Sequence, residues 1–159
     1  MRLLLKCIAV LNIAMTKLPA YSTHRSLPIA LLRTREAVMQ QFRPHLAELG
    51  VTEQQWRVLR VLGEDGPSEA GQVAGRACIL PPSLSRILKT LGTMRLVLTE
   101  SRKDDGRRTV IRLTALGEKV LAQALPQSKI VYSQLEKRIG AQKLRQLLDL
   151  LDDVQAQLR

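Results

Sequence analysis

The stretch 104–114 reads DDGRRTVIRLT. Asp-Asp-Gly is a turn sequence, and the residues after it alternate between polar and apolar side chains as in a β-strand. The preceding stretch 96–102, LVLTESR, alternates in the same way. Together they predict a β-hairpin with arginines at its tip, although a hairpin that only closed a sheet would need no such charge.

Four helices are expected before this hairpin. Apolar residues recur at helical spacing over 26–49, and Thr52 is a suitable N-cap for TEQQWRVLRVL. Ser68 is the expected cap of a short helix, SEAGQVAGRAC, and Pro81-Pro82 forces a turn before the next helix. The tight breaks between these segments indicate a helix-turn-helix pair that precedes the hairpin.

The helix expected at 81–94, PPSLSRILKTLGTM, separates apolar from polar side chains. Its apolar residues lie at positions i, i+3, i+4 and i+7, which places them on one buried stripe. The outward side chains are short hydroxyls and basic groups: Ser83, Ser85, Arg86, Lys89 and Thr90. Hydroxyls reach phosphates or base edges, and arginine can bind guanine through two hydrogen bonds. This face favours DNA contact over simple solvation.

The 159-residue chain is strongly basic, with a net charge of +11, which favours a polyanionic partner. The charge concentrates between positions 76 and 112, where nine basic residues stand against three acidic ones. Aromatic residues make up only 3% of the chain, so a stacking surface for single strands or RNA is not expected. These properties predict double-stranded DNA as the partner.

A helix-turn-helix followed by a two-stranded hairpin is a winged helix, in which the second helix of the pair enters the major groove. The hairpin tip then lies beside the minor groove, where Arg102, Arg107 and Arg108 would meet a concentrated negative potential. Asp105 can fix the direction of the Arg107 guanidinium by a charge-assisted hydrogen bond. The charged tip is therefore interpreted as a reader of the minor groove.

Two long helices are expected after the hairpin. Thr114 is the N-cap of the first, which continues past Pro126 with a kink and ends before Gly140. The last helix carries one broad apolar stripe: Leu144, Leu147, Leu148, Leu151, Val154 and Leu158. A hairpin and three short helices cannot cover a stripe of this length, so a second copy of the chain is the expected partner.

Residues 1–25 are expected to form a separate extension. Arg2 and the apolar run from Leu3 to Met15 resemble a secretory signal, but Lys6 interrupts the run and no A-x-A site follows. The run is also too short and too charged to span a bilayer. Two alternatives stay open: a helix that packs on a partner subunit, or upstream sequence translated from a misassigned start with Met15 as the initiator. Both predict a cytoplasmic protein.

Common enzyme motifs are missing from the sequence. It contains no phosphate-binding, dinucleotide-binding, zinc-protease or esterase motif, and the two histidines, His24 and His45, have no obvious catalytic partners. The two cysteines, Cys7 and Cys78, lie in no metal-ligand spacing. We therefore expect no catalysis, no cofactor and no bound metal.

The order of these elements, the D-x-R motif at Asp105 to Arg107 and the following VIRLT resemble the MarR family of winged-helix regulators. Within it, REAVMQQFRP, VTEQQWRVLRVL and CILPPSLSRIL are similar to the repressors of homoprotocatechuate and nicotinate degradation operons. The resemblance covers about residues 27–158. The family usually has a glycine where this chain has Arg95, and an acidic residue where it has Gly92.

The resemblance implies a mainly α fold with a small β-hairpin wing, built as a winged helix-turn-helix DNA-binding domain at 51–114. The helical regions 26–50 and 115–159 would interleave in an obligate homodimer, which would bind a pseudo-palindromic operator. A small aromatic acid would bind between the dimer region and the winged helix, where a cation and a flat apolar wall suit such a ligand. The candidate ligand residues are Arg35, His45, Trp56, Arg57 and Arg60.

The expected function is repression of an aromatic-acid catabolic operon, with release by a small aromatic carboxylate. One alternative is a thiol-based redox-sensing repressor that uses Cys78 or Cys7, although apolar neighbours would keep Cys78 unreactive. The other alternative is an architectural DNA-binding protein without an effector.

Overall fold

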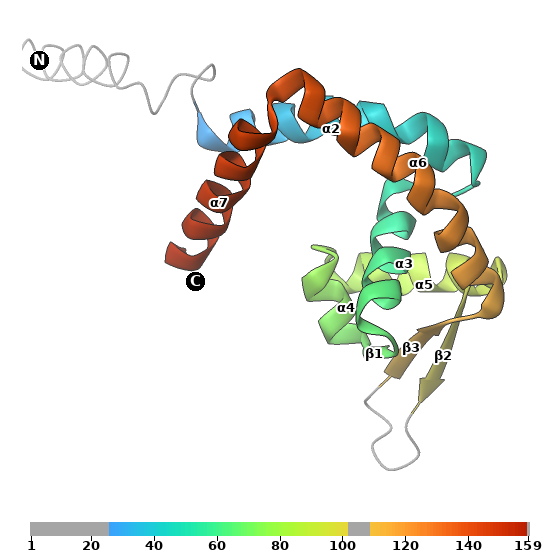
Figure 1. Cartoon of the computed structure of the whole chain (residues 1–159). Coiled ribbons are helices and arrows are strands. Elements are labelled where there is room, and N and C mark those ends of the chain that lie inside the picture. Colours follow the sequence, from blue (N-terminus) through green and yellow to red (C-terminus); the bar gives the residue numbers. More distant parts are fainter. Residues whose placement is uncertain (1–25, 102–108, 159) are drawn as a thin grey trace, which may run out of the picture. The chain divides into compact units, whose positions relative to one another are not determined.

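The computed structural model describes residues 26–101 and 109–158 (Figure 1). The chain divides into two compact units, residues 1–41 and 42–159. Helix α2 (Leu27–Glu48) begins in the first unit and ends in the second. The other described elements all belong to the second unit.

The second unit contains five further helices and three strands among its described residues. In chain order they are α3 (Glu53–Asp65), β1 (Ser68–Glu69), α4 (Ala70–Arg76), α5 (Pro81–Thr93), β2 (Val97–Ser101), β3 (Thr109–Leu113), α6 (Ala115–Ile139) and α7 (Ala141–Gln157). The strands form one antiparallel sheet with β3 between β1 and β2. Helices α3, α4 and α5 gather beside this sheet (Figure 1). The predicted helices and the predicted hairpin are thus confirmed.

Strand β1 was not predicted, and the expected role of Ser68 as a helix cap is wrong. Gly66 ends α3 with a left-handed φ of +73° and turns the chain toward the sheet. The backbone of Ser68 then pairs with Ile111 of β3, and its hydroxyl donates to the carbonyl of Gly66 at 3.0 Å. Glu69 takes the N-cap position of α4 instead. Ser68 joins the sheet because strand pairing satisfies the hydrogen bonds of its backbone groups.

Local capping fixes the starts of α3 and α6. The Thr52 hydroxyl accepts from the Gln55 N–H at 3.2 Å, and the Gln55 side chain accepts from the Thr52 N–H at 2.8 Å, which is a complete capping box. The Thr114 hydroxyl accepts from the Gly117 N–H at 3.0 Å. Helix α6 runs through Pro126 to Ile139, so the predicted continuation and both predicted caps are confirmed.

The core of the second unit lies between α3, α4, α5 and the sheet. Its most deeply buried side chains are Val58, Leu59, Val73, Leu91, Val97 and Ile111. Helix α6 begins tightly against the residues that follow α5, because a Cβ placed on Gly117 would lie 2.1 Å from the carbonyl oxygen of Leu96. This contact ties the orientation of α6 to the segment that joins α5 to β2.

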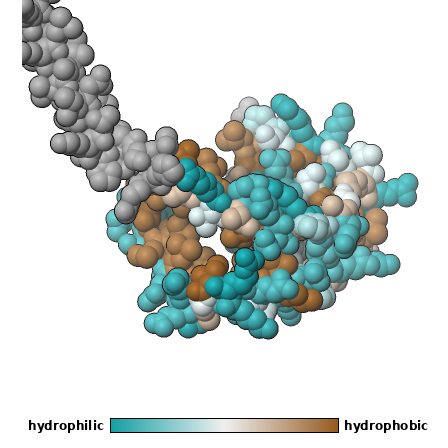
Figure 2. Space-filling model, turned by 90° about the horizontal axis from the view of Figure 1, so that it is seen from above, coloured by the Kyte–Doolittle hydropathy of each residue, from teal (hydrophilic) through white to brown (hydrophobic). Residues whose placement is uncertain are grey.

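Helix α7 keeps its apolar stripe at the surface. None of its described residues is buried, and its exposed large apolar side chains are Leu147, Leu148, Leu150, Val154 and Leu158. Figure 2 shows apolar side chains exposed on the face of the molecule seen from above. As expected, none of the stripe residues is buried by the rest of the described chain. In the part of the chain that the structure describes, no helix is long and apolar enough to span a membrane.

Candidate nucleic-acid interface

Helix α5 presents the polar face that its sequence predicts. Leu84, Ile87 and Leu91 are buried against the core. On the opposite side, Ser83 is half-buried, and the other predicted DNA contacts are exposed: Ser85, Arg86, Lys89 and Thr90. The amphipathic pattern therefore brings all five predicted residues of this helix onto its polar side.

Two of the predicted DNA-contacting hydroxyls of α5 donate their hydrogens within the helix. Ser85 Oγ donates to the carbonyl of Pro81 and Thr90 Oγ1 to that of Arg86, each at 3.2 Å. A hydroxyl bonded in this way has only its acceptor lone pairs left for an outside partner. Such oxygens suit the amino groups at the base edges of cytosine or adenine better than they suit phosphate oxygens, which are acceptors themselves.

Two basic residues near α5 are paired with acids. Arg76 Nη1 lies 3.0 Å from Asp65 Oδ1, and Arg112 Nε lies 2.9 Å from Glu100 Oε1. These exposed pairs contribute little stability, but each cancels a positive charge. The basic residues of α5 itself have no acidic partner among the described residues. The two cations on the polar face of α5, Arg86 and Lys89, therefore keep their full positive charge for a DNA partner.

Helix α5 ends in a Schellman motif. The Leu96 N–H donates to the carbonyl of Leu91 and the Arg95 N–H to that of Gly92, each at 2.9 Å. Arg95 has a left-handed φ of +58°, at the position where glycine is usual. The helix end is therefore formed, and the arginine adopts a conformation that is unfavourable for a residue with a Cβ atom.

Arg95→Gly should accordingly stabilise the fold. Removing the Cβ at this position should raise the free energy of unfolding by about 1 kcal/mol, since left-handed φ costs an L-residue about that much. Arg95→Ala is the matched control, because it removes the same charge and keeps the Cβ. Thermal unfolding of both variants checks the idea, and equal midpoints would contradict it.

The wing is described only at its base. Strands β2 and β3 pair from Val97 with Leu113 to Ser101 with Thr109, so the tip of the hairpin lies between positions 101 and 109. The remaining predicted DNA contacts, Arg102, Asp105, Arg107 and Arg108, lie outside the described residues. Their role as minor-groove readers stays a prediction.

Of the candidate effector residues, Trp56 and Arg60 lie together on α3. The Trp56 side chain is buried, and the Arg60 guanidinium carbon is 6.0 Å from the centroid of the Trp56 ring. Arg60 Nε also donates to Glu64 Oε1 at 3.0 Å, one helical turn further on. A flat apolar ring and a cation are thus adjacent, and both are groups that suit an anionic aromatic ligand.

Two further candidates lie on α2. The His45 Nε2 atom is buried and has no hydrogen-bond partner among the described residues, while its Nδ1 atom is 3.7 Å from a carboxylate oxygen of Glu48. Arg35 belongs to the first unit, where it lines a hollow along α2 with Leu32 and Glu36. The His45 imidazole therefore keeps one buried nitrogen available for a polar ligand group.

Arg57 has different surroundings from the other candidates. Its Nη1 atom donates to the carbonyl of Ala77 at 2.6 Å and to that of Cys78 at 3.2 Å. These carbonyls belong to the turn between α4 and α5. The Arg57 guanidinium thus contacts the helix-turn-helix turn.

The apolar neighbourhood expected around Cys78 is wrong. Its neighbours Ala77 and Ile79 are buried, but Cys78 itself is exposed. The reason is its position at the left-handed end of α4, with φ of +50°, where the backbone reverses and the side chain turns outward. The thiol is therefore accessible to solvent.

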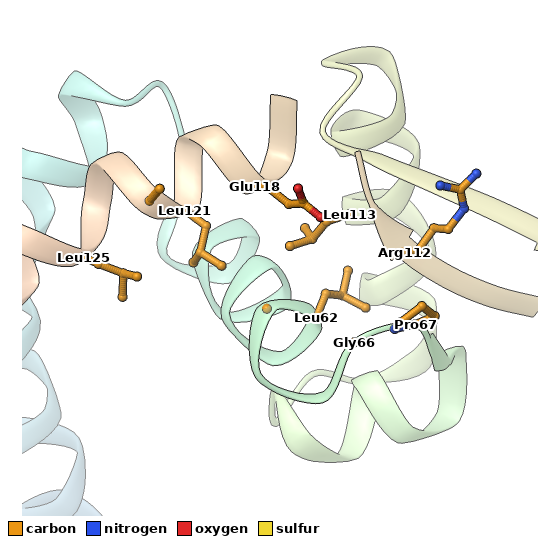
Figure 3. Close-up of a pocket in the computed structure, with 10 residues that line it drawn as sticks. Leu62, Gly66, Pro67, Arg112, Leu113, Glu118, Leu121 and Leu125 are labelled. Carbon is orange, nitrogen blue, oxygen red and sulfur yellow. The ribbon is translucent and has the colours of Figure 1, made fainter. Parts of the chain in front are cut away.

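A pocket that the sequence did not predict lies between the end of α3, strand β3 and the start of α6. It has a volume of about 530 Å³, and Leu62, Leu113, Leu121 and Leu125 supply its apolar wall. Figure 3 shows these leucines with Glu118 at one edge and Arg112 at another. None of the five predicted effector residues lines this pocket. It is formed by tertiary packing, so no short sequence pattern indicates it.

Comparison with known proteins identifies the family. The domain described as "winged helix DNA-binding domain" matches residues 51–117. The HTH-type transcriptional regulator FarR of Neisseria gonorrhoeae is 39% identical over 137 residues, 86% of this chain and 94% of that protein. The homoprotocatechuate degradative operon repressor of Escherichia coli is 42% identical over 130 residues, 82% of this chain and 88% of the relative. The chain belongs to the MarR family of transcriptional regulators.

A solved MarR-type structure supports the same assignment. The crystal structure of NadR in complex with 4-hydroxyphenylacetate is 40% identical in sequence, has a TM-score of 0.72, and aligns over 84% of this chain and 94% of that chain. This MarR-family chain is a DNA-binding transcriptional regulator with a winged-helix fold. The resemblance inferred from the sequence is confirmed, and helix α5 lies within the matched winged-helix domain.

Proposed function

We propose that this MarR-family regulator represses an operon for the breakdown of an aromatic acid and leaves the DNA when a small aromatic carboxylate binds. The observation that carries the proposal is the buried Trp56 ring with the Arg60 guanidinium beside it. The chain is also 42% identical to a repressor of homoprotocatechuate degradation and 40% identical to a protein crystallised with 4-hydroxyphenylacetate.

The effector is held, in this proposal, by three groups of different character. The Trp56 ring covers the face of the aromatic ligand, Arg60 binds its carboxylate, and the buried His45 Nε2 atom accepts or donates a hydrogen bond. Arg60 pairs with Glu64, so the ligand carboxylate competes with that acid for the guanidinium. An exposed pair of this kind contributes at most about 1 kcal/mol, which a desolvated carboxylate contact can exceed.

On the DNA, helix α5 enters the major groove and the wing reaches the adjacent minor groove. Residues 51–114 form this DNA-binding domain, and regions 26–50 and 115–159 form the dimerisation region. The exposed leucine stripe of α7 supports a homodimer, and its two-fold symmetry predicts a pseudo-palindromic operator. A regulator of this kind acts in the cytoplasm, where bacterial operons are transcribed.

The effector is tested with DNA selected from a random duplex pool. Adding 4-hydroxyphenylacetate should weaken operator binding at least about fivefold in fluorescence anisotropy at fixed salt, as expected for allosteric coupling. The neutral 4-hydroxyphenylacetamide should have little effect, because it offers no carboxylate to Arg60. If no aromatic carboxylate in a panel changes the affinity, the effector proposal is wrong.

Exposure of Cys78 favours one second candidate, a thiol-based repressor. In the same assay, peroxide in place of the carboxylate separates the two mechanisms. Release by peroxide that is lost in Cys78→Ser would support the thiol mechanism, whereas release by the carboxylate in that variant would support the proposal above.

Substitutions in α5 and in the wing should change DNA binding in different ways. Arg86→Ala should relax the preference at one base pair per half-site, if Arg86 binds a guanine through two hydrogen bonds. Arg107→Ala should weaken binding by roughly 1–3 kcal/mol with the major-groove preference kept. Asp105→Ala should also weaken binding if Asp105 orients Arg107. Tighter operator binding by Asp105→Ala would show that the orienting role is wrong.

A further inference from the structure

The turn between α4 and α5 is short and tightly specified. The Cys78 N–H donates to the carbonyl of Gly75 at 3.2 Å and the Ile79 N–H to that of Ala74 at 2.9 Å, so α4 closes in a Schellman motif. The left-handed residue of this motif is Cys78, with φ of +50°. A residue with a Cβ atom is unfavourable there, so the conformation needs support from outside the turn.

That support comes from α3. The carbonyls of Ala77 and Cys78 lie beyond the last turn of α4, and both accept hydrogen bonds from Arg57 Nη1, at 2.6 and 3.2 Å. The Nε atom of Arg57 is buried and has no acceptor among the described residues. The side chain is therefore held in a partly desolvated position, where its bonds to carbonyls are stronger than they would be in water.

The base of this side chain is rigid. Val58 and Leu59, the next two residues of α3, are fully buried in the core. On the other side of the turn, α5 begins at Pro81, where proline stiffens the backbone. A guanidinium fixed to the core thus determines where the turn lies, and the turn determines the direction in which α5 leaves it.

We infer that Arg57 is a positioning residue for DNA reading: it holds the α4–α5 turn so that the polar face of α5 meets the operator. This inference rests on the proposed insertion of α5 into the major groove. It gives Arg57 a role different from that of Arg60, which lies one helical turn further along α3 and pairs with Glu64. In α3, Arg57 thus supports DNA reading, whereas Arg60 binds the effector.

The variants that separate these roles are Arg57→Ala, Arg57→Lys and the matched control Arg60→Ala. Arg57→Ala should weaken binding to the selected operator about tenfold, similar to one misread base pair, with binding to a scrambled duplex changed less than about twofold. Its affinity for 4-hydroxyphenylacetate, measured by calorimetry, should stay within about twofold of the parent. Arg60→Ala should instead lower the affinity for 4-hydroxyphenylacetate much more than the affinity for the operator.

Two further measurements distinguish the loss of this positioning contact from a general loss of stability. Hydrogen exchange of peptides covering 77–84 should accelerate in Arg57→Ala and stay unchanged in Arg60→Ala, because only Arg57 contacts the turn. Arg57→Lys keeps a charged donor, so it should recover part of the operator preference. If Arg57→Ala does not fold, the lysine variant decides the question, since its operator preference should then lie measurably below that of the parent.

Several results would overturn the inference. Unchanged operator preference in Arg57→Ala, or a loss of effector affinity with operator binding kept, would place Arg57 in the effector site or at an inert surface. Equal weakening on the operator and the scrambled duplex would indicate a lost charge only. If Arg86→Ala also leaves operator preference intact, the proposal that α5 enters the major groove is wrong, and the inference about Arg57 is then wrong as well.

Discussion

Leu148→Glu is expected to convert the protein from a dimer into a folded monomer. Leu148 lies on the apolar stripe of α7 and is 53% exposed in the single chain, and no described residue of α7 is buried. The substitution therefore removes no contact from the core of the monomer. In a dimer that buries this stripe, it exchanges the burial of a leucine for an unpaired buried charge, at a cost of about 3–6 kcal/mol.

Analytical ultracentrifugation at micromolar concentration measures this change. A cost of that size raises the dissociation constant at least about a hundredfold. Gln146→Glu is the matched control, because it adds the same charge at an exposed polar position on the same helix, and it should stay dimeric. A parent chain that sediments as a monomer, or a Leu148→Glu chain that stays a dimer, would refute a dimer interface at this stripe.

Gly117→Ala is expected to destabilise the fold by about 3 kcal/mol, at the upper end of the usual cost of overpacking. The new Cβ would lie 2.1 Å from the backbone oxygen of Leu96. That oxygen already accepts from the Thr114 N–H at 3.0 Å, so it cannot move without disturbing the connection between α5 and β2. The thermal midpoint should fall by about 10 °C.

Gly63→Ala is the control for this prediction. Its Cβ would lie 2.2 Å from Leu121 Cδ2, which is an equally short contact with the end of a flexible side chain. Rotation of the leucine relieves the clash, and alanine also favours the helical conformation, so the net cost should be about 1 kcal/mol or less. Equal midpoints for the two variants would show that the approach of α6 to Leu96 is looser than described.

The sequence by itself determined the elements that depend on near neighbours. Thr52 and Thr114 cap their helices by bonds that span three residues, and the polar face of α5 follows from the helical period alone. The two strands of the hairpin follow from the alternation of polar and apolar residues in LVLTESR and RTVIRLT. Such patterns can be read directly, because the interacting groups are close in sequence and their geometry is fixed by the local backbone.

The tertiary structure decided what depends on distant partners. Ser68 joins a strand because it meets Ile111, and Arg57 turns to carbonyls 20 and 21 residues away, although its position on α3 suggested an effector contact. Cys78 is exposed because its backbone reverses at the end of α4, a conformation that its apolar neighbours do not reveal. For Ser68 and Arg57, a backbone or side-chain polar group found a partner that only folding brought close, and local spacing contains no information about such a partner.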